Sequence, residues 1–141
     1  VDFRVGGRNV VREGLDVTVI ACGIMVAAAL DAAAMLVEES ISVGVLDLYS
    51  LRPMDTAAIL TAARETGALV CAEEHLLVGG MGSNVARIVS SEYPVPMRFV
   101  GLADVYVESG DPDDLLEKYH LTADDICLAV REVMTAKTKA G

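Results

Sequence analysis

Residues 16–48 read DVTVIACGIMVAAALDAAAMLVEESISVGVLDL, and this stretch decides the fold. Its two ends, 16–22 and 42–48, are short apolar runs rich in Val and Ile, which is typical of buried strands. Between them, apolar residues recur at the spacing of one helix face: Val26, Ala29, Leu30, Ala33 and Val37. A strand, a helix and a second strand in this order predict a parallel βαβ unit.

The same alternation of strand-type and helix-type segments continues along the chain. Strand-type runs also occur at 68–73 and 97–102, so successive runs begin 26 to 29 residues apart. The gaps hold helical patterns, one beginning after Arg52-Pro53 and one opening in the glycine-rich segment 79–82. Four such strands separated by helices indicate an α/β domain with a mostly parallel sheet.

The N-terminal segment is less regular than the rest. A Gly6-Gly7 turn signal lies between short β-prone pieces. Residues 1–14 are therefore expected to form either an antiparallel edge strand or a linker. Residues 15–135 are then expected to form the domain itself.

The C-terminal region contains two helix-start signals. Asp111-Pro112 is typical of an N-cap followed by the first helical residue, which predicts a short helix ending at Lys118. Thr122 is expected to cap a second, last helix, and residues 136–141 are expected to fray.

Composition and charge exclude several function classes. The 141 residues are enough for one domain with its own core, which should be closely packed because aromatic residues make up only 4%. The chain has 21 acidic and 11 basic residues, a net charge of −10, so neither nucleic acid nor an anionic membrane surface is an expected partner. The longest apolar run, 20–30, is also too short to span a bilayer.

The three cysteines are Cys22, Cys71 and Cys127. Their odd number and the absence of a CxxC spacing argue against a disulfide framework or a zinc site. We expect reduced cysteines in the core of a cytoplasmic protein.

One segment concentrates residues that could carry chemistry. It comprises Glu73, Glu74, His75, Gly79, Gly80, Gly82 and Ser83. The segment follows the third strand, at the carboxyl edge where open α/β sheets bind ligands, and it opens a helix whose free N–H groups suit a phosphate or carboxylate. The simpler interpretation is that the glycines let the helix pass close to the sheet and that the polar side chains bond across a loop or an interface. We favour this second interpretation for the isolated chain.

Tests for established motifs give little support to an active site here. Val85 replaces the third glycine of a dinucleotide-binding fingerprint, and the chain has no phosphate-binding GxxxxGK[ST] motif. A hydrolase using Ser83 and His75 remains an alternative, although Ser83 lies outside a GxSxG elbow. Arg52 is placed to meet a substrate phosphate or, as we prefer, a carboxylate of a neighbouring chain.

Four segments in order resemble the C-terminal domain of the transketolase family. They are DVTVIACGIMVAAALDAA at 16–33, VGVLDLYSLRPMD at 43–55, ALVCAEEHLLVGGMGSNVA at 68–86 and ESGDPDDLLEKYHLTADDI at 108–126. The resemblance covers nearly the whole chain, from Gly7 to Met134. The second and third segments are shared with deoxyxylulose-phosphate synthase and with the β-subunits of 2-oxoacid dehydrogenases. The last segment is most similar to transketolase, particularly the short C-terminal subunit of split transketolases.

The resemblance implies a three-layer α/β/α fold with a five-stranded mixed sheet, mostly parallel with one antiparallel strand. It also implies that the whole enzyme moves two-carbon ketol units between sugar phosphates with thiamine diphosphate and Mg²⁺. In this family the cofactor lies between two other domains and is held by a GDG…N motif, which Ser109-Gly110-Asp111-Pro112 does not reproduce.

The resemblance therefore implies a supporting role for this chain. No catalytic, cofactor-binding or metal-binding residue is expected in it, and it should be inactive alone. Its expected partners are upstream transketolase domains or an N-terminal subunit, together with a second copy in a homodimer. The start at Val1 is expected to reflect either an excised piece or a natural small subunit.

The family's pattern gives one set of residues an interface role or an accessory anion site. It comprises Arg52, Glu74, His75, Gly79, Gly80, Gly82 and Ser83. The alternative is a free-standing module in which the glycine loop and Arg52 hold a phosphorylated metabolite without chemistry.

Overall fold

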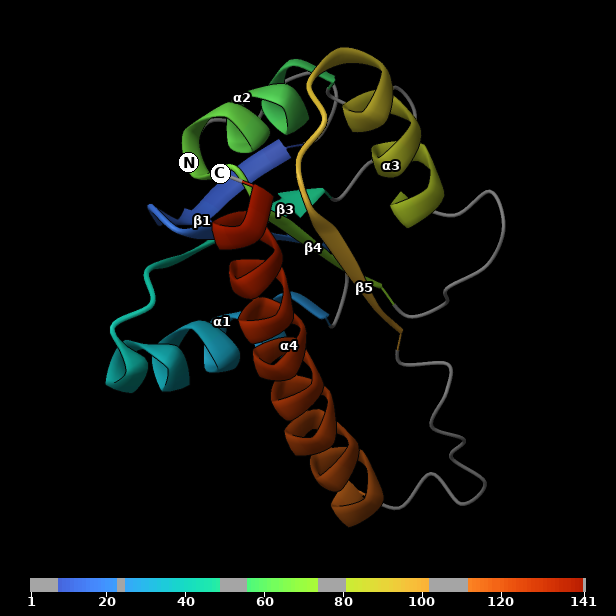
Figure 1. The fold of residues 1–141 in the computed structure, drawn as a ribbon. Coiled ribbons are helices and arrows are strands. Elements are labelled where there is room, and N and C mark those ends of the chain that lie inside the picture. The colour runs from blue at the N-terminus through green and yellow to red at the C-terminus, as the bar shows by residue number, and fades with distance from the viewer. Residues whose placement is uncertain (1–7, 23–24, 49–55, 74–80, 102–111, 141) are drawn as a thin grey trace.

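The computed structural model describes residues 8–22, 25–48, 56–73, 81–101 and 112–140, with side chains described from residue 10 in the first segment and over 123–139 in the last (Figure 1). The strands are β1 (Arg8–Arg12), β2 (Val17–Ala21), β3 (Val43–Leu48), β4 (Leu69–Glu73) and β5 (Met97–Gly101). The helices are α1 (Met25–Leu36), α2 (Thr56–Thr66), α3 (Met81–Glu92) and α4 (Pro112–Ala140), with a short 3₁₀ turn at Val37–Glu39. No helix in these described ranges is long and apolar enough to cross a membrane.

The five strands form one mixed sheet in the order β1-β3-β2-β4-β5. Strands β3, β2, β4 and β5 are parallel, and β1 pairs antiparallel with β3 at one edge. The four parallel strands begin and end within one residue of the predicted ranges. The N-terminal piece supplies the antiparallel strand, so the mixed, mostly parallel sheet is confirmed.

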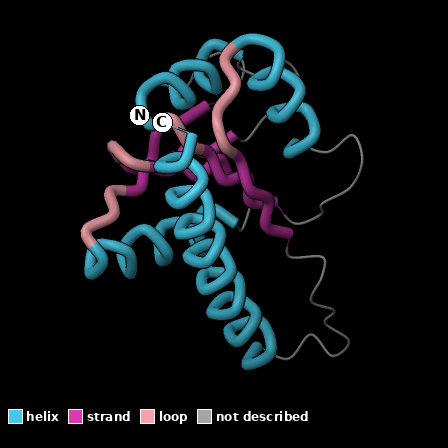
Figure 2. The backbone as a smooth tube through the Cα atoms, in the orientation of Figure 1, coloured by secondary structure: helices cyan, strands magenta, loops and turns pink. Residues whose placement is uncertain are grey.

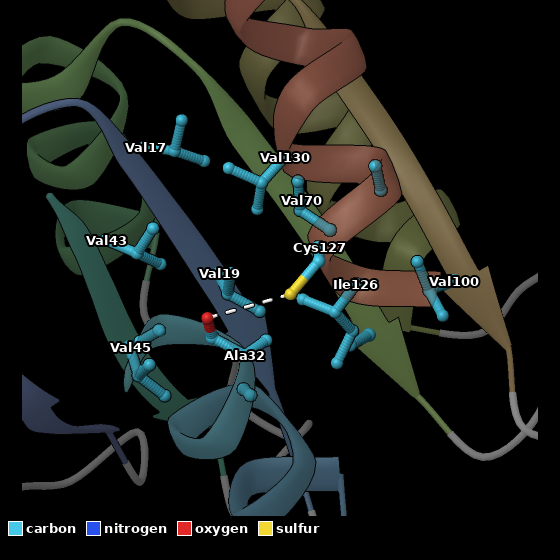
Figure 3. Packing of buried hydrophobic residues seen from close by; sticks show 14 of the residues in the cluster. Val17, Val19, Ala32, Val43, Val45, Val70, Val100, Ile126, Cys127 and Val130 are labelled. Atoms are coloured by element: carbon cyan, nitrogen blue, oxygen red, sulfur yellow. Dashed lines mark hydrogen bonds between the residues drawn. The ribbon is translucent and has the colours of Figure 1, made fainter. Parts of the chain in front are cut away.

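Helices cover both faces of the sheet, which confirms the three-layer architecture (Figure 2). Successive residues of β2 point to opposite faces of the sheet. Val19 packs with α1 and α4, whereas Ile20 packs with α2 and α3. Figure 3 shows the first of these cores, where Val17, Val19 and Val70 meet the α4 residues Ile126 and Val130. Small residues from α1 fill the space that large aromatic side chains would otherwise occupy.

Helix α1 buries a different face from the one that its sequence predicts. The buried residues are Met25, Ala28, Ala29, Ala32, Ala33 and Leu36. Of the predicted stripe, Ala29 and Ala33 are buried, but Val26 and Leu30 are only partly buried and Val37 is 57% exposed. The reason is that α1 is apolar almost all round, so the spacing of its apolar residues does not define a single buried face. Contacts with the sheet and with α4 choose the buried face instead.

The prediction of two C-terminal helices is wrong. The structure has a single helix, α4, from Pro112 to Ala140, so Thr122 is inside a helix and does not cap one. No glycine or proline interrupts residues 113–140, and a Thr-x-x-Asp signal without a breaker does not end the preceding helix.

The C-terminal end, which we expected to fray, is helical through Ala140. A contact with the start of β2 holds it, because the Lys137 ammonium donates a 2.9 Å hydrogen bond to the Asp16 carbonyl oxygen. The last turn of α4 is thus attached to the domain.

Two glycines bring the N-terminal segment against the sheet. An added Cβ on Gly14 would lie 2.0 Å from the backbone nitrogen of Gly44. No side chain fits in that space, so the backbones of 12–14 and β3 approach more closely than other residues allow. This close approach, together with the β1–β3 pairing, attaches β1 to the domain.

Candidate functional site at the carboxyl edge of the sheet

The carboxyl ends of β2, β3, β4 and β5 meet at the edge where the sequence places its candidate residues. Of these candidates, the structure describes Gly82 and Ser83, both in the first turn of α3. The others fall outside the described residues: Arg52, Glu74, His75, Gly79 and Gly80.

Glu73, the last residue of β4, binds the first turn of α3 through its carboxylate. Its Oε2 atom accepts a 3.0 Å hydrogen bond from the backbone nitrogen of Met81, and its Oε1 atom accepts one of 3.1 Å from that of Gly82. The side chain is only 7% exposed. Because both oxygens accept from N–H groups at the positive end of the helix, the negative charge is stabilised in a buried position.

This contact bears directly on the expected anion site. Two of the helix N–H groups that could bind a phosphate or carboxylate ligand already donate to Glu73. The bond also fixes the distance between residue 73 and the start of α3, the two ends of segment 74–80. Sequence reasoning included Glu73 in the motif but not among the site residues. The available signal was a carboxylate that ends a buried strand shortly before a glycine-rich helix start.

Gly82 provides room for this arrangement. A Cβ at this position would lie 3.0 Å from Cδ1 of Phe99 and 3.1 Å from Oε1 of Glu73. Both distances are shorter than ordinary van der Waals contacts. Gly82 therefore lets the first turn of α3 pass close to β4 and β5.

Ser83 lies in the first turn of α3 and its side chain is exposed. The buried residues of this helix are Met81, Gly82, Val85 and Val89. An exposed hydroxyl at the start of a helix is available for a contact outside the domain. The structure does not describe His75, so it does not place the pair that a hydrolase would need.

The buried thiols are poor candidates for chemistry. Burial, together with the nearby Glu73 carboxylate, raises the pKa of Cys71 far above its usual range. Burial also raises the pKa of Cys127, whose Sγ atom donates to the Ala32 carbonyl oxygen at 3.7 Å (Figure 3). Both thiols therefore stay protonated near neutral pH and behave as core residues.

Asp47 is a partly buried polar residue that the sequence analysis did not single out. Its Oδ1 atom is buried and has no hydrogen-bond partner in the described part of the chain. Burial raises the pKa of this carboxyl group. Asp47 lies near the end of β3, at the same edge as Glu73, and it is on the same face of the strand as Val43 and Val45, which pack with α1 and α4.

The described side chains at this edge do not fit a Mg²⁺–diphosphate group. Among the described residues, no group of three or more His, Cys, Asp or Glu side chains could hold a metal ion. Both oxygens of Glu73 already accept hydrogen bonds, and Asp47 is a single carboxyl with a raised pKa. The described edge thus offers neither the several oxygen ligands that Mg²⁺ needs nor a cluster of cationic groups for phosphate.

Comparison with known proteins agrees with this architecture. The family model for the transketolase C-terminal domain matches residues 6–126. A solved structure described as a split gene transketolase, inactive beta4 tetramer, superposes with a TM-score of 0.85 at 50% sequence identity. That match covers 97% of this chain and 45% of the other.

Curated relatives give the same result at the level of sequence. A 6-deoxy-6-sulfo-D-fructose transketolase subunit from Clostridium sp. (strain MSTE9) is 43% identical over 96% of this chain. A 1-deoxy-D-xylulose-5-phosphate synthase from Heliobacterium modesticaldum is 38% identical over 94% of it. The chain spans 42% of the first relative and 21% of the second.

Proposed function

This chain belongs to the family of transketolase C-terminal domains, and from that membership we propose that it is the C-terminal part of a thiamine-diphosphate-dependent transketolase. The whole enzyme would transfer two-carbon ketol units between sugar phosphates. The observation that carries the proposal is the match over nearly the whole chain to a split gene transketolase at 50% identity. At that identity the likeness extends beyond the fold.

Within this enzyme, we assign the chain to assembly rather than to chemistry. The described residues do not fit a Mg²⁺–diphosphate group, so the cofactor would be held by other parts of the enzyme. The carboxyl edge would face those parts, with Glu73 fixing both ends of segment 74–80. Glu74, His75, Gly79, Gly80 and Arg52 would then contribute to the interface.

The partners that we propose are upstream transketolase domains or an N-terminal subunit, and a second copy of the chain. One relative is itself described as a transketolase subunit, and the solved neighbour is described as a tetramer of one chain type. Both descriptions support a protein that works in an assembly. We propose a cytoplasmic location, which fits three cysteines that form no disulfide.

Reconstitution tests this proposal. Ketol transfer from a sugar phosphate is measured with the chain alone, with its copurifying partner alone and with both, each with thiamine diphosphate and Mg²⁺. We expect activity only in the mixture, and a partner that is fully active without the chain would refute the assembly role. The alternative, a free-standing module for a phosphorylated metabolite, predicts that the lone chain binds such a ligand. The helix N–H groups of Met81 and Gly82 do not favour it, because they donate to Glu73.

A further inference from the structure

Strand β5 forms one outer edge of the sheet, with α3 and α4 beside it (Figure 1). The backbone nitrogen of Leu69 in β4 donates to the carbonyl oxygen of Pro96 at 3.1 Å. In a parallel ladder, alternate residues of a strand bond to the same neighbour, so 98 and 100 also face β4. The peptide groups of Met97, Phe99 and Gly101 consequently point away from the sheet. The Phe99 side chain, at the centre of this edge, is 43% exposed.

A hollow of about 270 Å³ lies between this edge and α4. Val100 and Gly101 line it from the strand, and Leu128 lines it from the helix. The acidic residues Asp125 and Glu132 also belong to its lining. The hollow therefore combines some apolar surface with negative charge, which suits the stem and head of a long cationic side chain.

The opposite edge of the sheet, β1, is built differently. It has Arg8 and Arg12 at its two ends, and its pairing with β3 is irregular between Val10 and Arg12. If two copies of β1 paired antiparallel around Val10, the arginines would lie opposite one another. Like charges and bulges are devices that protect edge strands from pairing. Strand β5, MRFVG, carries a single charge and no such protection.

We propose that β5 is the surface through which two copies of this chain associate, by antiparallel pairing of the two β5 strands around Phe99. The outward N–H and C=O groups of Phe99 in the two copies would exchange two hydrogen bonds, and the flanking pairs would join Met97 to Gly101 of the other copy. This inference names the surface for the self-association in the proposed function and rests on it.

Charge complementarity argues for a second copy as the occupant. Pairing around Phe99 sets Arg98 of one chain opposite Val100 of the other, on the face that α4 covers. That places its guanidinium at the acidic hollow beside Asp125 and Glu132. A two-fold axis repeats the contact, so one surface supplies both the cation and the acidic hollow.

Among the described residues, Arg98 contacts Met97 and Glu132. Its Nη1 atom donates to the Met97 carbonyl oxygen at 2.8 Å, and its Nε atom lies 3.7 Å from Oε1 of Glu132. The two side chains of this ion pair are 42% and 53% exposed, so the pair is screened by water and readily exchanged. Arg98 can therefore exchange its contacts with Met97 and Glu132 for contacts with the second copy.

The test uses the complete natural polypeptide that carries this sequence, with any subunit that copurifies. Phe99→Lys places a charge at the centre of the β5 edge, and Val10→Lys is the matched control at the centre of β1, where Val10 is 41% exposed. Sedimentation equilibrium gives the association constant between copies, and circular dichroism verifies that both variants fold. Hydrogen exchange of the unsubstituted protein at high and low concentration follows residues 97–101 and 8–12. Ketol transfer is assayed in the same samples.

We expect Phe99→Lys to weaken association at least tenfold and Val10→Lys to leave it within twofold. Exchange in 97–101 should slow as concentration rises, whereas exchange in 8–12 should not change. Unaltered association in Phe99→Lys, or protection of 97–101 that requires the other subunit, would overturn the β5 proposal. Ketol transfer separates this failure from that of the enzyme assignment, because an active assembly without β5 pairing refutes only the surface. If Phe99→Lys does not fold, the exchange data decide alone.

Discussion

Glu73 and Gly82 are separated by a whole loop in the sequence, yet the Oε1 atom of Glu73 lies 3.1 Å from the backbone nitrogen of Gly82. The Glu73 carboxylate joins the end of β4 to the start of α3 at the edge that we assign to the interface. A buried carboxylate with two N–H donors is a costly group to alter, because any substitute must still satisfy both donors.

Replacing Glu73 by Gln should destabilise the domain. The amide keeps the shape of the side chain but removes the charge, and it can present only one oxygen to the two N–H groups. Hydrogen bonds to charged groups contribute about 1.5–3 kcal/mol, so we expect the free energy of unfolding to fall by about 2 kcal/mol. Urea unfolding measures it, with the exposed Glu92→Gln as control. Equal stability of the two variants would show that the Glu73 contact contributes nothing.

Gly82→Ala tests the close packing of α3 on Phe99. The new methyl group would lie 3.0 Å from the Phe99 ring, so overpacking should cost about 1–2 kcal/mol despite the better helix propensity of Ala. Thermal unfolding should show a loss for Gly82→Ala and no loss for Ser83→Ala, the exposed neighbour. Adding Phe99→Ala to Gly82→Ala should recover part of the loss. Strictly additive effects would mean that the ring is not the obstacle.

Gly14→Ala tests the backbone approach between the N-terminal segment and β3. Its Cβ would lie 2.0 Å from the Gly44 nitrogen, and backbone cannot move aside as a side chain can. We expect a loss of about 3 kcal/mol in the free energy of unfolding, at the upper end of overpacking effects. Gly44→Ala should cost less, because its nearest contact is 3.0 Å. The reverse order in urea unfolding would contradict the β1 arrangement.

The Arg131–Glu39 pair should make stability depend on pH. Arg131 donates to both carboxylate oxygens of Glu39, at 2.7 Å and 2.9 Å in the shortest contacts, and these bonds hold the pKa of Glu39 below its usual 4.5. A lowered pKa means that the folded state favours the ionised carboxylate. The contribution is therefore complete above about pH 5.5 and disappears as pH falls through the lowered folded value.

Unfolding of the unsubstituted protein and of Arg131→Met across pH 3–7 measures this effect. The difference between them should be small, because both groups are exposed, and it should vanish at the acidic end. Glu39→Gln provides the control, since it removes the titrating group. A difference that persists unchanged at pH 3 would assign it to packing of the arginine stem instead.

Most of the fold could be predicted from local sequence. Strands β2, β3 and β4 are buried almost throughout, so they form nearly continuous apolar runs that are easy to recognise. The face of α1 could not be predicted, because a helix that is apolar all round has no preferred side until its neighbours are in place. The continuous α4 was missed because a capping signal at Thr122 is compatible with a helix interior when no glycine or proline follows.

The candidate site was predictable in place but not in detail. The candidate residues follow β4 in the sequence, which indicated the carboxyl edge of the sheet. The described part of the site lies at that edge. The role of Glu73 depends on a hydrogen bond across segment 74–80, and no periodic pattern in the sequence encodes such a contact. The burial of the Asp47 Oδ1 atom likewise depends on the packing of elements that are distant in the sequence.

The most direct test of the transketolase assignment is the native mass of the polypeptide that carries this sequence, purified from its source cells with its bound partners. We predict that it travels with domains or a subunit that contain a GDG…N segment, that the assembly carries thiamine diphosphate, and that it transfers ketol units. A polypeptide of 14.9 kDa that runs without such a partner and shows no ketol transfer would contradict the account.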